Sequence, residues 1–140
     1  MRPFKWNKGN GVFLPEVDAE HREIFRLAAE LQHAVSSGAD KSGVLAAMES
    51  LAGVIEEHFT HEERLMRAAS CPSYEWHRKQ HSTARKQMRR SRAGFIAGDT
   101  AAPGDFLEFL SRWLKDHLGL TDRMMSAQVR NHARVRAAVS

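Results

Sequence analysis

Apolar residues recur at intervals of three and four positions in four segments of the chain, with short polar interruptions between them. This spacing is typical of α-helices that bury one face, because residues three and four positions apart lie on the same side of a helix. No segment alternates apolar and polar residues over a length that predicts a β-strand. The predicted helices run over about residues 18–35, 41–69, 73–97 and 105–120.

Short segments rich in Ser, Gly, Asp and Pro separate the predicted helices. They cover residues 36–40, 70–73 and 98–104, and these residue types are frequent in turns. Asp18 and Ser73 are candidates for helix N-caps. Because short connections make consecutive helices antiparallel, the sequence predicts an all-α fold, an antiparallel up-down-up-down four-helix bundle.

Both ends of the chain are predicted to lie outside the bundle. Residues 1–17 contain Gly9, Gly11 and Pro15 and are predicted to form an extended N-terminal arm. Residues 123–140 form a C-terminal tail that is compatible with a short fifth helix. With the bundle over residues 18–122, we expect a single domain over residues 1–140, since this length suits one compact core.

Composition and charge narrow the class of protein. Hydrophobic residues make up 42% of the chain and charged residues 27%, which is ordinary for a globular domain. An apolar run of about 18 residues is missing, and so is the apolar centre of a signal peptide, so no membrane segment is expected. Cys71 is the single cysteine and cannot form an intramolecular disulfide, which favours a reducing cytoplasm.

The chain is basic, with a formal net charge of +4 and an isoelectric point of about 9.6. A basic surface can bind nucleic acid. Here the basic residues of segment 78–92 are scattered among polar helix positions without aromatic residues between them. This pattern predicts a solvated helix face, and no nucleic-acid partner is expected.

Histidine is the most unusual feature, with eight residues in a chain of 140. Six polar side chains fall on the predicted apolar faces: His21, His58, Glu62, His77, His81 and His117. One buried histidine is commonly satisfied by a hydrogen bond. Left unpaired, however, each of the six would cost about 1–3 kcal/mol, and the sum approaches the stability of a whole domain. We therefore expect a shared partner that satisfies them together.

The spacing of these residues indicates one common site. His58 and Glu62 are four positions apart, as are His77 and His81, so each pair lies on one helix face. Asp122 follows His117 by five positions and is predicted at or beyond the end of the fourth helix, with its carboxylate directed back toward the same centre. In an antiparallel bundle, all these positions lie at the same end.

The residue types favour a metal centre. Imidazole binds zinc, copper and iron, and a carboxylate can bridge two ions. Five histidines and two carboxylates exceed the ligands of one tetrahedral zinc ion and fit two metal ions. A purely structural site, for example for zinc, is kept as an alternative. Covalently attached haem is not expected, because the sequence contains no Cys-x-x-Cys-His motif.

These motifs resemble the hemerythrin family. They are Asp18-Ala19-Glu20-His21, His58-Phe59-Thr60-His61-Glu62-Glu63, His77-x-x-x-His81, and Trp113-x-x-x-His117 followed by Asp122. The resemblance covers about residues 6–122, and the length and the arm with Trp6 are similar to single-domain bacterial members. His61 adjoins the ligand pair and is expected at the rim of the site.

The resemblance implies a non-haem di-iron centre that cycles between Fe2+ and Fe3+. His77, His81 and His117 would hold one iron, while His21 and His58 would hold the other and leave it an open position. Glu62 and Asp122 would bridge the two ions, with an oxo or hydroxo group as a third bridge. The implied function is reversible binding of dioxygen, or of another small diatomic ligand, for carriage, storage or sensing.

The resemblance also implies an apolar oxygen pocket that keeps water and oxidants away from the iron. The matching positions are Ile24, Phe59, Trp113, Leu118 and Gly119. Two other functions stay open at this point. One is an enzyme acting on peroxide, nitric oxide or iron, and the other is a module whose redox state is read by a protein partner that the sequence does not identify.

Gly119 departs from the family, whose members usually carry a bulkier apolar residue near the oxygen pocket. A glycine there leaves the pocket more open, although it also suits a helix-terminal turn. We expect Gly119→Leu to slow autoxidation of the iron centre, measured as the decay of the oxygen-bound optical spectrum. An unchanged decay rate would contradict this role.

Overall fold

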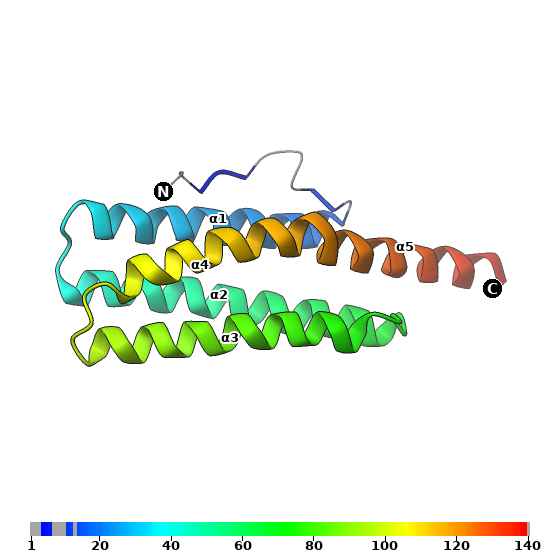
Figure 1. Cartoon of the computed structure of the whole chain (residues 1–140). Helices are drawn as coiled ribbons and strands as arrows, with labels where there is room; N and C mark the ends of the chain where they lie inside the picture. The colour runs from blue at the N-terminus through cyan, green and yellow to red at the C-terminus, as the bar shows by residue number, and fades with distance from the viewer. Residues whose placement is uncertain (1–3, 7–10, 13, 140) are drawn as a thin grey trace.

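The computed structural model describes residues 4–6, 11–12 and 14–139 of the chain. It contains the α-helices α1 (Pro15–Ser36), α2 (Lys41–Ala68), α3 (Tyr74–Ile96), α4 (Ala102–Asp116) and α5 (Asp122–Val139), with a π-helical turn, η2 (His117–Thr121), between α4 and α5. Within these described ranges there is no strand. Figure 1 shows α1, α2, α3 and α4 packed side by side in alternating directions, which confirms the predicted all-α antiparallel bundle.

The predicted bounds of the second and third helices agree with α2 and α3 to within one residue at each end. Asp40 caps α2, since its side chain accepts a hydrogen bond of 2.8 Å from the Gly43 amide. Ser73 precedes α3 but makes no capping hydrogen bond. Its hydroxyl instead donates to Gln128 Oε1 of α5 at 2.8 Å.

The first helix begins earlier than predicted. It starts at Pro15, because proline has the backbone angle of a helix and lacks the N–H that the first turn leaves unpaired. Asp18 is therefore not an N-cap. It lies in the first turn of α1, where its carboxylate accepts a hydrogen bond from the Val12 amide.

The fourth helix also extends further than predicted. The chain stays helical from Ala102 to Val139 through η2, so α5 continues the direction of α4 and projects past the end of the bundle (Figure 1). The predicted short fifth helix is 18 residues long. Gly119 lies inside η2 and does not end the helix, and its surroundings are outside what the structure describes.

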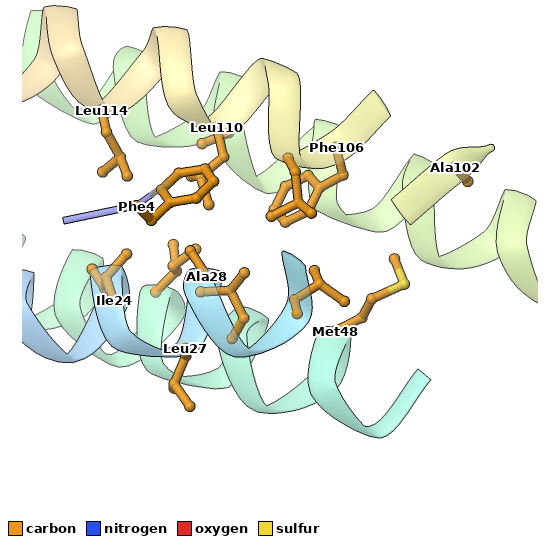
Figure 2. Close-up of a cluster of buried hydrophobic side chains, with 14 of the residues drawn as sticks. Phe4, Ile24, Leu27, Ala28, Met48, Ala102, Phe106, Leu110 and Leu114 are labelled. Atoms are coloured by element: carbon orange, nitrogen blue, oxygen red, sulfur yellow. The ribbon is translucent and has the colours of Figure 1, made fainter. Parts of the chain in front are cut away.

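Two apolar clusters fill the bundle. The main cluster takes side chains from α1, α2, α3 and α4, and part of it is shown in Figure 2. The smaller cluster contains Val12, Val17, Met66, Cys71 and Met125. Along α1, His21 lies between Val17 of the smaller cluster and Ile24 of the main one. The predicted metal-binding residues therefore form a polar layer between two apolar regions.

The N-terminal arm packs against the bundle rather than standing free. Phe4 is buried in the main cluster and meets Phe25 edge to face, with ring centroids 6.4 Å apart. Val12 is completely buried in the smaller cluster. None of the described helices combines the length and the hydropathy needed to cross a membrane.

A matched pair of isoleucines tests the main cluster. Ile55 is 1% exposed and Ile96 is 44% exposed. We expect Ile55→Ala to lower the free energy of unfolding by about 2–5 kcal/mol, because it removes buried apolar surface and leaves a cavity. Ile96→Ala should cost about 1 kcal/mol or less. Urea unfolding of the metal-free protein measures both, and equal losses would contradict this description of the core.

Candidate metal centre

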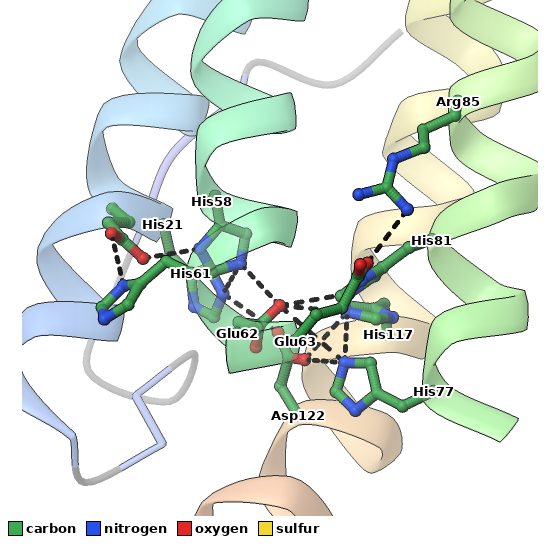
Figure 3. Close-up of polar contacts among 11 residues, drawn as sticks. His21, His58, His61, Glu62, Glu63, His77, His81, Arg85, His117 and Asp122 are labelled. Carbon is green, nitrogen blue, oxygen red and sulfur yellow. Dashed lines mark hydrogen bonds and ion pairs between the residues drawn. The ribbon is translucent and has the colours of Figure 1, made fainter. Parts of the chain in front are cut away.

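The structure brings together all seven side chains that the sequence singled out as metal ligands. They come from four helical segments and meet inside the bundle (Figure 3). Every one is buried, with at most 2% of its surface exposed: His21, His58, Glu62, His77, His81, His117 and Asp122. Such burial of ionisable side chains requires a charged or hydrogen-bonding partner.

Glu62 lies at the middle of the cluster. Its Oε1 atom is 2.9 Å from His58 Nε2 and 3.2 Å from His81 Nε2. The same oxygen is 3.8 Å from the Nε2 atoms of both His77 and His117. One carboxylate thus faces four imidazoles that come from three different helical segments.

Asp122 lies on the other side of the cluster. Its Oδ1 atom is 2.8 Å from His117 Nε2 and 3.0 Å from His77 Nε2, and its Oδ2 atom is 2.9 Å from His21 Nε2. One oxygen of Asp122 therefore faces imidazoles from α3 and η2, and the other faces an imidazole from α1.

Potential ligand atoms fall into two groups, each with atoms within 4.8 Å of one another. The first group is Glu62, His77, His81, His117 and Asp122, and the second is His21, His58, Glu62 and Asp122. Both carboxylates belong to both groups. The arrangement offers two adjacent metal positions that share two carboxylates, with three imidazoles at one position and two at the other.

Local helix geometry explains how the pairs converge. The spacing of four residues keeps His58 beside Glu62 on α2 and His77 beside His81 on α3. In a regular α-helix, residues five positions apart point about 140° away from each other. The π-turn removes this divergence, because the Asp122 amide bonds to the His117 carbonyl and places the two residues on one face. Asp122 thus lies within a continuous helical segment, and not at or beyond the end of the helix as predicted.

Two further carboxylates support the imidazoles from outside. Glu20 Oε1 is 2.8 Å from His58 Nδ1, and Glu63 Oε2 is 2.8 Å from His81 Nδ1. Glu63 also accepts a hydrogen bond of 2.9 Å from Arg85. The roles of Glu20, Glu63 and Arg85 were not predicted, although each glutamate is the direct chain neighbour of a predicted ligand.

His61 lies at the rim, as predicted. Its side chain is 23% exposed, and its Nδ1 atom is 2.8 Å from Glu20 Oε2. Glu20 therefore bridges the buried His58 and the partly exposed His61 with its two oxygens.

The electrostatics of the cluster favour bound cations. Burial by itself lowers the pKa of His58, but the charge of Glu62 and the hydrogen bond with Glu20 raise this pKa to about 10. Burial also lowers the pKa of His77, but its close contacts with the carboxylates of Asp122 and Glu62 outweigh burial and raise this pKa to about 9. Without metal, protons on imidazoles thus balance the buried carboxylates.

The carboxylates show the complementary effect. Burial would raise the pKa of Glu62, yet the neighbouring imidazoles hold this pKa well below its ordinary value. The pKa of Asp122 is lowered too, since contacts with His117 and His21 outweigh burial and the charge of Glu62. Both groups are therefore present as carboxylates, the form that binds metal.

Hydrogen bonds alone do not satisfy this cluster. Among the described residues, both oxygens of Glu62, both oxygens of Asp122 and Nε2 of His81 are buried without a partner in hydrogen-bond geometry. The distances are short, but the donors and acceptors are misaligned. Lone pairs that converge in this way suit coordination of metal ions, so the donor set fits a pair of cations.

Aromatic rings cover the side of the cluster with three imidazoles. Phe59 stacks on His81 with centroids 3.9 Å apart and planes 8° apart, and Trp113 stacks on His117 at 4.1 Å and 16°. Phe59 is fully buried and Trp113 partly buried. The other predicted pocket residues that can be described, Ile24 and Leu118, are buried in the same main cluster.

Comparison with solved structures supports the fold. A wild-type hemerythrin crystal structure aligns with a TM-score of 0.82 at 21% identity, covering 89% of this chain and 96% of that chain. A point mutant of hemerythrin aligns with a TM-score of 0.85 at 19% identity, covering 92% of this chain and 98% of the other.

Proteins with similar sequences include bacteriohemerythrins and a myohemerythrin. A bacteriohemerythrin from Stenotrophomonas maltophilia is 26% identical over 91% of this chain and 82% of its own length. A bacteriohemerythrin from Aquifex aeolicus is 29% identical over 92% and 97%, respectively. A myohemerythrin from Theromyzon tessulatum is 26% identical over 86% and 88%.

The family described as "Hemerythrin HHE cation binding domain" matches residues 12–129. This range includes all seven converging side chains and most of the chain. The chain belongs to the hemerythrin family.

Proposed function

We propose that this protein holds two non-haem iron ions and binds dioxygen reversibly at one of them. The observation that carries the proposal is the pair of ligand groups that share Glu62 and Asp122. The groups are unequal, with three imidazoles in one and two in the other, so the metal held by two imidazoles would have room for an external ligand. The bacteriohemerythrins and myohemerythrin among the relatives support the choice of iron and dioxygen.

Each ligand has a role in this proposal. His77, His81 and His117 would hold the first iron, His21 and His58 would hold the second, and Glu62 and Asp122 would be shared by both. When bound, the iron pair would supply reversible electron transfer to dioxygen.

Two carboxylates outside the cluster orient the imidazoles. An imidazole that binds metal through Nε2 carries its proton on Nδ1, and a carboxylate that accepts this proton fixes the tautomer and the ring orientation. Glu20 is in position to do so for His58, and Glu63 for His81. One imidazole in each ligand group is therefore held from outside the cluster.

The apolar surroundings limit solvent access. Phe59 and Trp113 lie flat against two candidate ligand imidazoles, while Ile24 and Leu118 belong to the same apolar cluster. Exclusion of water would favour reversible binding, because water that reached the centre would compete with dioxygen for the metal. The apolar wall thus serves reversible binding more directly than turnover of a polar substrate.

An anaerobic optical titration tests the proposal. Metal analysis should give about two iron ions per chain, as the seven ligands require. Adding dioxygen to the reduced protein should produce a charge-transfer band in proportion to the oxygen bound, and degassing should abolish the band. A single zinc ion, an irreversible spectral change, or steady consumption of peroxide or nitric oxide would each overturn the proposal.

The outer carboxylates give a second test. We expect Glu20→Gln and Glu63→Gln each to weaken iron binding by about 10–100-fold, because the ligand imidazole loses its charged acceptor. Glu49→Gln is the matched control, since Glu49 lies on α2 in an exposed ion pair with Arg92. Competition with a chelator measures the affinity, and equal affinity in all three variants would argue against an orienting role.

A further inference from the structure

One residue of the N-terminal arm is held by both of its backbone polar groups. The Val12 amide donates to Asp18 Oδ1 at 2.8 Å, and the Val12 carbonyl accepts a hydrogen bond from the Ser126 hydroxyl. Val12 and Ser126 are both completely buried. The arm is thus fastened to α1 on one side and to α5 on the other.

Asp18 and Ser126, the two residues that bind the backbone of Val12, each lie about one helical turn from a proposed metal ligand. Asp18 precedes His21 by three residues on α1, and Ser126 follows Asp122 by four residues on α5. His21 and Asp122 touch each other directly, with 2.9 Å between Nε2 and Oδ2. The link through Val12 therefore joins the same two helices about one helical turn away from that contact.

Val12 also completes the apolar cluster on this side of the metal centre. The cluster consists of Val12, Val17, Met66, Cys71 and Met125. Val17, Met66 and Met125 lie three or four residues from His21, Glu62 and Asp122, respectively, so their side chains lie one turn from ligands on α1, α2 and α5. Val12 of the arm therefore packs in one cluster with side chains from the same helices that carry these ligands.

We propose that Asp18 and Ser126 are positioning residues that fasten Val12 as a strap across this end of the centre. The strap holds α1 and α5 at the separation that lets His21 and Asp122 share metal, and it keeps water out of the apolar cluster beneath them. Its expected effect is to slow the loss of iron. This inference rests on the proposed iron site.

The chain offers a control for the hydrogen bond itself. Ser73 donates to Gln128 of α5 at 2.8 Å, which ties α5 to the start of α3 without involving the arm. Ser73→Ala removes a serine hydrogen bond to the same helix but leaves the strap in place. A second control is Asp18→Asn, since the amide oxygen of asparagine can still accept from the Val12 amide.

The experiment measures how fast an iron chelator removes iron from the fully loaded protein. We expect Asp18→Ala and Ser126→Ala to release iron about tenfold faster than the unaltered protein, as each leaves a buried backbone group of Val12 without its partner. Asp18→Asn and Ser73→Ala should stay within about twofold, because the strap persists. Urea unfolding of each variant separates strap loss from general destabilisation.

Amide hydrogen exchange in the metal-free protein provides a readout that does not depend on iron. Faster exchange at Val12 and over residues 122–129 in both alanine variants, but not in the controls, supports the strap even if the centre holds no iron. Two irons in the unaltered protein with equal release from all variants would overturn the strap and leave the proposed function intact. Faster release in Ser73→Ala as well would also overturn the strap.

Discussion

The structure depends on the burial of two ionised carboxylates. Glu62 and Asp122 are completely inaccessible to solvent, and a buried carboxylate is tolerated only beside compensating positive charge. Five imidazoles surround the pair, but their contacts leave the carboxylate oxygens without aligned hydrogen bonds. Protons on the imidazoles can balance the charge, whereas metal ions balance it and also use the lone pairs. The charge requirement therefore selects cations for this space.

The need to compensate these two carboxylates makes the packing of the whole bundle depend on one site. The candidate ligands come from α1, α2, α3 and the continuous segment of α4, η2 and α5. The polar layer lies between two apolar clusters, so a shift of any one helix exposes apolar surface and separates charges at once. Because ligands from distant parts of the chain meet only in the folded state, binding of metal also stabilises the fold. The rigidity of the site and the stability of the bundle therefore both depend on this polar layer.

The predictable features are those with a regular period. The apolar stripes on α1, α2 and α3, and the pairs His58/Glu62 and His77/His81, follow from helix geometry and antiparallel order alone. The π-helical turn was not predictable, since a glycine such as Gly119 is common where a helix ends. The turn also depends on contacts between His117 and Asp122, which a periodic pattern does not reveal. Glu20 and Glu63 lie beside the buried stripes, where periodicity assigns residues to the surface. The docking of Phe4 and Val12 has no periodic signal at all.

The outer carboxylates add a second asymmetry to the unequal number of imidazoles. Glu63, behind His81, is 14% exposed and shares its charge with Arg85. Glu20, behind His58, is 31% exposed and is shared with His61 instead of an arginine. A carboxylate paired with a guanidinium accepts a hydrogen bond from its imidazole less strongly, so we expect Glu63 to polarise His81 less than Glu20 polarises His58. Under the proposed function, the metal position with only two imidazoles would then also have the more strongly donating histidine, which would favour electron transfer to dioxygen there.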